Sequence, residues 1–253
     1  MNILAGSAQH IGARAYQQDA FAFSSQGTEF VAHAGILAIV CDGMGGMARG
    51  DLASEVATAA FLESYLSKSL KESIPAALER SLHTANANVV AEARKLNLME
   101  EMGTTLVAAV IHQDELHYVS VGDSGLFHAR AGQIRTMNRP HVFANYLDQA
   151  AAHGTITHHS AQTHPGRDLL TSFVGARMLE EIDRSHRPAH LIPGDVVLLA
   201  SDGLFNTLSI EEIGSAVGKG PEALAERLIA QTLAAENPTQ DNVTVLTLAC
   251  FRD

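Results

Sequence analysis

Short apolar runs separated by turn residues recur along most of the chain. Apolar runs of about four to eight residues are typical of buried strands. They predict strands over residues 3–10, 19–25, 35–41, 104–111, 116–121, 125–129, 133–137, 181–187, 196–200 and 242–250. The strands between 104 and 137 follow one another at the spacing of hairpins.

Helical periodicity separates these groups of strands. Apolar residues recur at helical spacing from Leu52 onward, and Pro75 suits the first turn of a second helix that ends near residue 96. Ser209, with Glu212 three residues later, matches the capping box that begins a helix, and Pro221 opens another apolar stripe. Two pairs of helices are therefore inserted among the strands.

The order of the elements predicts the fold class. Strands and helices do not alternate throughout, which argues against a parallel doubly wound sheet. Two packed antiparallel sheets covered by helices fit the order better. Segment 139–176 is rich in His, Gly and Thr, and we expect a mobile excursion there with short helical pieces. No repeat or linker divides the chain, so we expect one domain over residues 1–253 with an insertion at about 139–176.

Composition and charge exclude several classes of partner. The chain has 253 residues, of which 46% are apolar, and it can bury a large core. Its formal net charge of −11, with no Lys/Arg run longer than two, argues against nucleic acid as a partner. No apolar stretch is long enough to span a membrane. The first residues lack the pattern of a signal peptide, and we expect a monomeric cytoplasmic protein.

Four aspartates lie at the ends of apolar runs beside small or glycine-rich turns: Asp42, Asp123, Asp202 and Asp241. A carboxylate in such a position is held on a rigid strand but points out of the core. Together with Asp19 they predict an oxygen-rich cluster. Carboxylates that lie close together repel one another unless cations lie between them. The sequence therefore predicts a site for hard metal ions.

The segment 42–46 reads Asp-Gly-Met-Gly-Gly and joins a predicted strand to a predicted helix. A glycine-rich turn in this place can bind phosphate in dinucleotide folds. Here Asp42 precedes the first glycine and would repel a phosphate, and the next strand follows only after two helices. The glycines instead permit close approach of the backbone, so that the carbonyl of Gly43 can join Asp42 as a metal ligand. An ordinary strand–turn–helix corner is the plain alternative.

Six motifs occur in order: Arg14-x-x-x-x-Asp19, Asp42-Gly-Met-Gly-Gly, Gly103-Thr-Thr, Val121-Gly-Asp-Ser, Ser201-Asp-Gly-Leu-Phe and Asp241-Asn-Val-Thr. Each motif alone is weak, but the ordered set is specific. In this set the chain resembles the type 2C (PPM) family of metal-dependent Ser/Thr protein phosphatases, and most of all its compact bacterial members, from about residue 5 to residue 250. The resemblance implies a β-sandwich flanked by helices on both sides, a four-layer α-β-β-α fold of the α+β class.

The resemblance also implies a role for each acidic residue. Asp42 would bridge two metal ions, and the carbonyl of Gly43 would help to bind the first. Asp202 and Asp241 would bind the second ion, and Asp123 together with Asp202 would bind a third. All of these ligands are oxygens, so we expect two to three Mn²⁺ or Mg²⁺ ions and not zinc.

The implied reaction is hydrolysis of phosphoserine or phosphothreonine by direct attack of a water that bridges the metals. Asp19 would act on the metals directly or through waters, and Arg14 would bind the phosphate of the substrate. Arg14, Asp42 and Asp202 would be the catalytic residues. The substrates would be phosphorylated proteins, and a bacterial Ser/Thr kinase would be the cognate partner.

Four positions depart from the pattern that is common in the family: Gln18 replaces Glu, Met44 replaces the His of many eukaryotic members, Gly125 replaces Arg and Asn206 replaces Asp. None of these changes removes an aspartate of the metal set, so an active phosphatase is the expected function. The alternatives are a phosphoprotein-binding regulatory module with weak catalysis, and a phosphatase of small metabolites that uses the same site.

Segment 139–176 contains five histidines: His141, His153, His158, His159 and His164. They form no His-x-x-x-His pair beside a glutamate on a convincing helix and have no cysteine partner, so zinc is not indicated. We expect solvated loop histidines. The resemblance implies that this segment is a flap beside the active site.

Overall fold

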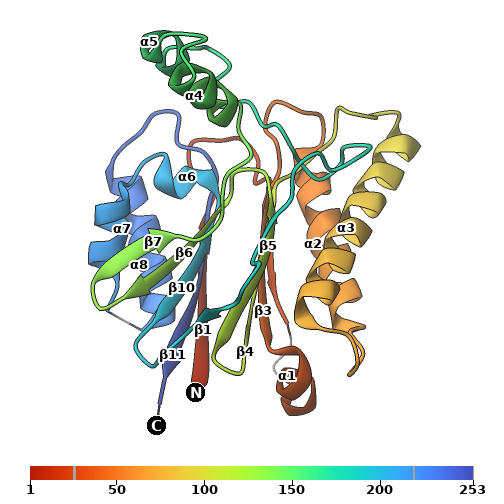
Figure 1. Ribbon diagram of the computed structural model, residues 1–253, viewed down its shortest axis with the longest axis vertical. Helices are drawn as coiled ribbons and strands as arrows, with labels where there is room; N and C mark the ends of the chain where they lie inside the picture. The colour runs from red at the N-terminus through yellow and green to blue at the C-terminus, as the bar shows by residue number, and fades with distance from the viewer. Residues whose placement is uncertain (25–26, 219, 253) are drawn as a thin grey trace.

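The structure is a computed structural model that describes residues 1–24, 27–218 and 220–252. Its strands form two antiparallel sheets that pack face to face (Figure 1). The first sheet has the order β1 (Asn2–His10), β11 (Val243–Phe251), β10 (Val196–Ala200), β6 (Gly125–Arg130), β7 (Gln133–Thr136). The second has the order β2 (Asp19–Phe23), β3 (Ile36–Asp42), β4 (Leu106–His112), β5 (Glu115–Val121), β8 (Asp183–Arg184), and β9 (Ala189–His190) also pairs with β5.

Helices cover the outer face of each sheet (Figure 1). The second sheet carries α2 (Gly50–Leu66) and α3 (Ile74–Leu96), and the first carries α7 (Ile210–Ala216) and α8 (Pro221–Ala234). The short helix α1 (Thr28–Ala34) joins β2 to β3, and α6 (Asp202–Phe205) follows β10. Helices α4 (Ala144–Ala152) and α5 (His158–Gln162) project beyond one end of the sandwich. The predicted four-layer α-β-β-α arrangement is confirmed.

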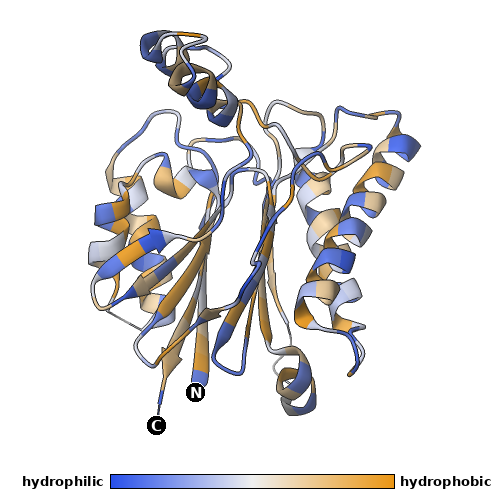
Figure 2. Ribbon diagram, in the orientation of Figure 1, coloured by the Kyte–Doolittle hydropathy of each residue, from blue (hydrophilic) through white to orange (hydrophobic). Residues whose placement is uncertain are grey.

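Three apolar layers connect the sheets and helices, and Figure 2 shows the apolar residues along the strands of both sheets. On β3, Ala38 and Val40 belong to the layer between the sheets, whereas Leu37 and Ile39 belong to the layer beneath α2 and α3. Successive strand residues point to opposite faces. A strand covered on both sides is therefore apolar throughout, which explains the unbroken run of residues 35–41.

The observed elements differ from the predicted ones mainly in short pieces. The predicted strand 181–187 is reduced to β8, because only two of its residues pair with β5. Helices α1 and α6 were not predicted, since seven and four residues are too few to show a helical period. Ser25, the last residue of the predicted strand 19–25, lies outside the described residues. No helix in the described ranges combines the length and hydrophobicity that crossing a bilayer requires.

Candidate metal centre

The strand ends that carry four of the predicted aspartates meet at one end of the sandwich. Asp19 begins β2 and Asp42 ends β3, and the two lie directly opposite each other in the β2–β3 register. Asp202 begins α6 just after β10, and Asp123 lies in the turn before β6. Because the end of β10 pairs with the start of β6, these two residues also come together.

Two threonines fix the backbone of Asp42. Its amide donates to Thr105 Oγ1 (3.0 Å), and its carbonyl accepts from the Thr105 amide (2.8 Å) and from Thr104 Oγ1 (2.8 Å). Thr105 Oγ1 also lies 2.6 Å from Ser124 Oγ, next to Asp123. The Gly103-Thr-Thr motif therefore connects the two turns that carry these aspartates.

Asp19 connects the two sheets through its side chain. Asp19 is 7% exposed, and its Oδ2 accepts hydrogen bonds from Ser201 Oγ (2.8 Å) and Thr244 Oγ1 (2.7 Å). Ser201 directly follows β10 and Thr244 lies in β11, both strands of the other sheet. Its Oδ1 has no hydrogen-bond partner. Burial raises the pKa of Asp19 to about 6; the two hydroxyl donors oppose the rise, and the charge of Asp202 adds to it.

Burial and mutual repulsion raise the pKa of the other carboxyls as well. The pKa of Asp42 lies well above its usual value because of burial and the charges of Asp19, Asp202 and Asp123. Burial and then the charge of Asp202 raise the pKa of Asp123 to about 7. The charges of Asp19 and Asp202 act directly on the Asp42 carboxyl, so the three carboxyls are close neighbours. Such neighbours can remain together only if a proton or a cation lies between them.

The donor set fits divalent metal ions. Asp19 Oδ1 and Asp202 Oδ1 are buried and accept no hydrogen bond, although Asn206 Nδ2 donates to Asp202 Oδ2 at 2.9 Å. Unpaired buried acceptors cost free energy, and a cation would satisfy both of them. We call the neighbouring carboxyls of Asp19, Asp42, Asp123 and Asp202 the carboxyl row. Within residues 1–24, 27–218 and 220–252, no three His, Cys, Asp or Glu side chains are already arranged to hold an ion.

Asp241 and Arg14 form an ion pair at the edge of this row. Arg14 Nη2 lies 2.7 Å from Asp241 Oδ2, and the two side chains are 47% and 39% exposed. A side chain on Gly45 would begin 3.8 Å from Arg14 Nη1, so the guanidinium lies beside the turn that follows β3. In this exposed place the guanidinium can bind a phosphate. While it is paired with Asp241, it also competes with any cation for that carboxylate.

Asn242 fastens the segment that carries Arg14. The residue is 4% exposed, and its Nδ2 donates to the carbonyls of Ile11 (2.8 Å) and Tyr16 (3.1 Å). Its Oδ1 accepts from the amide of Gln18 (2.7 Å). Sequence reasoning missed this role, because an asparagine after an aspartate is also ordinary turn chemistry.

Position 43, directly after β3, leaves no room for a side chain. A Cβ on Gly43 would collide with the carbonyl of Gly50 and with the backbone of Gln18. The start of α2 therefore packs directly against the backbone next to Asp42, as the predicted close approach requires. Metal binding by the Gly43 carbonyl itself stays a prediction.

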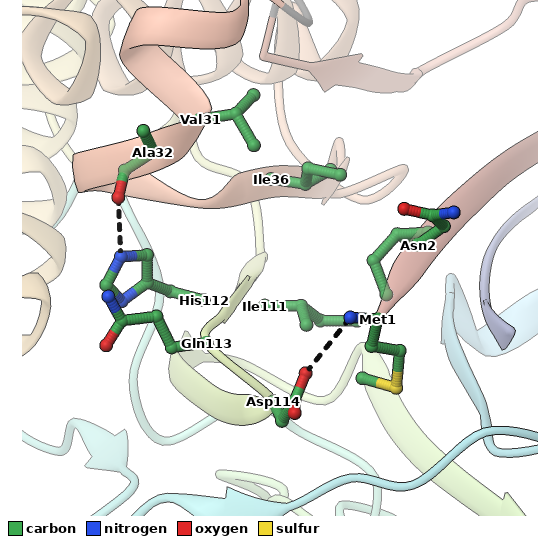
Figure 3. A pocket seen from close by; sticks show the side chains of 10 residues that line it. Met1, Asn2, Val31, Ala32, Ile36, Ile111, His112, Gln113 and Asp114 are labelled. Carbon is green, nitrogen blue, oxygen red and sulfur yellow. Dashed lines mark hydrogen bonds and ion pairs between the residues drawn. The ribbon is translucent and has the colours of Figure 1, made fainter. Parts of the chain in front are cut away.

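Another hollow, of about 520 Å³, lies at the far end of β3 (Figure 3). Met1, Ile36 and Asp114 are among the residues that line it, and the Met1 amino group lies 3.9 Å from the Asp114 carboxylate. Ile36 begins β3 and Asp42 ends it, so the length of the strand separates this hollow from the carboxyls. None of the predicted site residues lines it.

The histidines of segment 139–176 differ in burial, and the expectation that they are solvated is wrong for His141. This residue is 3% exposed, and its Nδ1 accepts from the amide of Gly122 (3.1 Å). Its own amide donates to the carbonyl of Gly122 (2.9 Å), and burial lowers its pKa. His141 therefore ties the start of the segment to the turn that carries Asp123. The other four are exposed: His153, His158, His159 and His164.

Two packed antiparallel sheets covered by helices on both sides are the fold expected for a metal-dependent phosphatase of the predicted class. The family model for protein phosphatase 2C matches residues 7–243. The chain belongs to this family, and the predicted family is confirmed.

Individual relatives agree with this assignment. The chain is 30% identical to the serine/threonine phosphatase stp of Listeria innocua over 214 aligned residues, and this alignment covers 83% of this chain and 82% of that protein. The serine/threonine phosphatase of S. agalactiae matches with a TM-score of 0.84 at 26% identity, over 98% of this chain and 100% of that one. The catalytic domain of the phosphatase PstP, in complex with two manganese ions, matches with a TM-score of 0.77 at 26% identity over 99% of both chains. The manganese-bound relative supports metal dependence.

Proposed function

We propose that this chain hydrolyses phosphoserine and phosphothreonine in proteins, using two to three Mn²⁺ or Mg²⁺ ions. Asp42, Asp202 and Asp241 would bind two ions, Asp123 with Asp202 would bind a third, and Asp19 would support them. The observation that carries the proposal is the row of buried carboxyls with unpaired oxygens on Asp19 and Asp202.

The residues of the chain orient and neutralise the reacting groups. When bound, the ions supply a nucleophilic water and offset the charge of the phosphate. Arg14 can donate two hydrogen bonds to phosphate oxygens, and these bonds would stabilise the negative charge that the phosphate carries in the transition state. Asn206 orients Asp202 through its bond to Oδ2.

The two serines next to the aspartates, Ser124 and Ser201, are not free to act as nucleophiles in place of water. Ser124 follows Asp123, but it is 1% exposed and its Oγ lies 2.6 Å from Thr105 Oγ1. Ser201 Oγ donates to Asp19 and also accepts from the Thr244 amide (3.0 Å). These engaged hydroxyls support direct hydrolysis without a phosphorylated enzyme.

Residues 1–253 would form one phosphatase domain, with 139–176 as a flap at the active-site end. Helices α4 and α5 of this segment stand beyond the end of the sandwich where α6 lies (Figure 1). Asp168 of the segment lines the same cavity as Asp123. The chain would act as a cytoplasmic monomer on proteins that a bacterial Ser/Thr kinase phosphorylates.

The test is turnover of p-nitrophenyl phosphate and phosphothreonine peptides with Mn²⁺. EDTA and Asp42→Asn should each lower kcat at least about 100-fold, the scale of losing a contact that stabilises transition-state charge. Glu226→Gln changes an exposed carboxylate on α8 and should keep wild-type rates. Phosphopeptide binding without turnover would instead indicate a regulatory module. Turnover of metabolite phosphates but not peptides would indicate a metabolite phosphatase.

A further inference from the structure

A cavity of about 980 Å³ opens directly beside the metal centre, and we call it the side cavity. Its lining comes from β6, β7, the start of segment 139–176 and the stretch from α6 to α7. Two of its lining residues, Asp123 and Asp202, are carboxyls of the metal centre. Apolar residues make up much of the lining: Phe127, Pro140, Val142, Phe205, Leu208 and Ile210.

Glycine at position 125 keeps the aromatic part of this lining in place. The rings of Phe127 and Phe205 pack edge to face, with centroids 5.7 Å apart and planes at 64°. A Cβ on Gly125 would lie 2.6 Å from the Phe127 ring and 2.9 Å from the Phe205 ring. Any side chain at this position would have to displace one of the rings.

Thr136 marks the exposed side of the cavity. It lies directly opposite Phe127 in the β6–β7 register and also lines the cavity. Residues opposite each other in an antiparallel pair have their side chains on the same face of the sheet. Thr136 is exposed, whereas Phe127 is 4% exposed. The lining therefore runs from an open strand edge to a buried aromatic ring.

We infer that the side cavity binds a large apolar side chain of the phosphoprotein substrate, within about two residues of the phosphorylated residue. This inference rests on the proposed function and adds a sequence preference to it. An extended chain advances about 3.3–3.6 Å per residue. A substrate whose phosphate lies at the metal centre can therefore place only its nearest neighbours in a cavity that shares Asp123 and Asp202 with that centre.

The chemistry of the lining selects the occupant. Arg139 and Asp168, one of each charge, also line the cavity, and in the proposed function the ions neutralise Asp123 and Asp202. The rings of Phe127 and Phe205, with Leu208 and Ile210, favour removal of an apolar side chain from water. Leucine, methionine and phenylalanine combine sufficient size with the absence of charge.

The test compares phosphothreonine peptides that carry alanine or leucine at each of about three positions on either side of the phosphorylated residue. The measured quantity is the ratio of kcat/KM for the leucine peptide to that for the alanine peptide, with Mn²⁺ present. We expect a ratio of about ten at one position within two residues of the phosphothreonine, the usual scale for filling an apolar pocket. A ratio within one protein cancels any general loss of activity.

Variants at the exposed side connect this preference to the cavity. Thr136→Trp fills the cavity and should bring the ratio close to one, while Thr136→Val keeps the size of the side chain and should keep the ratio. Aromatic and β-branched residues both suit a strand, so the two variants should fold. Ile210→Ser removes apolar lining at the start of α7 and should lower the ratio about threefold.

The outcomes separate failure of the side-cavity inference from failure of the proposed function. A wild-type ratio near one, with peptides turned over, would remove the inference and leave the proposed function intact. A ratio that survives in Thr136→Trp would place the preference elsewhere and would also remove the inference. Absence of turnover with every phosphopeptide would overturn the proposed function itself.

Discussion

Replacing Asn242 with alanine should release the segment that carries Arg14 without changing a carboxyl of the metal centre. The Asn242 side chain makes three hydrogen bonds to this segment, to the carbonyls of Ile11 and Tyr16 and from the amide of Gln18. Alanine removes all three bonds. Asp241 keeps its place in the backbone, but its partner Arg14 loses the anchored segment that positions it.

The cost in stability can be worked from these bonds. A hydrogen bond contributes about 0.5–1.5 kcal/mol net, so three contribute about 1.5–4.5 kcal/mol. The bonds to the Ile11 and Tyr16 carbonyls are only partly buried, so water can replace the lost donors there. We therefore expect the free energy of unfolding to fall by about 2 kcal/mol. A domain is commonly stable by about 5–15 kcal/mol, so the variant should fold.

Urea unfolding measures the stability, and steady-state kinetics with phosphopeptides measure the effect on Arg14. We expect kcat/KM to fall about tenfold in Asn242→Ala and further in Arg14→Ala, since residues in one hydrogen-bonded network are coupled. The double variant should be no slower than Arg14→Ala within about twofold. Asn88→Ala is the matched control, because Asn88 is exposed and its amide donates to the Thr84 carbonyl on the surface of α3.

Additive losses would refute this reasoning. If the double variant lost activity by the product of the two single losses, Asn242 would act independently of Arg14. A stability loss no larger than that of Asn88→Ala would show that other bonds hold the segment. The bond from the Ala13 amide to the Gln240 carbonyl (2.8 Å) is the first candidate for such a bond.

Two further predictions concern pH. Mn²⁺ should raise the melting temperature more at about pH 7.5 than at about pH 5.5, because at the lower pH protons compete for Asp19, with a pKa of about 6, and Asp123, with a pKa of about 7. Calorimetry measures this, and equal shifts at both pH values would contradict it. The pKa of His141 is lowered, whereas those of Asp19 and Asp123 are raised. The stability that the neutral His141 side chain contributes is therefore complete above about pH 6.5 and is lost as the pH falls, because the unfolded chain then binds more protons than the folded one. The free energy of unfolding of wild type should exceed that of His141→Asn by less and less as the pH falls toward about 5.5, with a slope of at most about 1.4 kcal/mol per pH unit. A difference that stays constant with pH would show that the pKa of His141 does not change on folding.

The sequence predicted those parts of the fold that local chemistry determines. The run 35–41 became a strand buried on both faces, and the capping box formed with both of its bonds, from the Ser209 amide to Glu212 Oε2 (2.8 Å) and from the Glu212 amide to Ser209 Oγ (3.3 Å). Both features depend on residues within a few positions of each other. Local periodicity and cap chemistry are sufficient to predict them.

The supports of the candidate site could not be predicted in this way. Asp19 accepts bonds from Ser201 and Thr244, which are 182 and 225 positions away along the chain. Asn242 binds residues more than 200 positions away. A lone polar residue beside an apolar run has no local pattern that names its partner, and only the packing of the two sheets reveals it. The contact between position 125 and the Phe205 ring, 80 positions away, was missed for the same reason.

The exact placement of the carboxyls requires more than core packing. Like charges directly opposite each other in an antiparallel pair are destabilising, and Asp19 and Asp42 occupy such positions. Because β3 is apolar on both faces, its hydrophobic pattern alone specifies its register weakly. The bonds between Asp42 and Thr105 at the end of β3 distinguish the observed register from a slipped one.

A second group of hydroxyls acts on Asp19. Ser201 and Thr244 hold one oxygen of its carboxyl and leave the other free, so that the side chain has a fixed direction despite the repulsion of its neighbours. The apolar layers supply the free energy that offsets this repulsion. The hydroxyl side chains fix the direction of the Asp19 carboxyl. Without them, the carboxyls could relieve their repulsion by turning apart, and the unpaired oxygens that a cation can bind would no longer face one another.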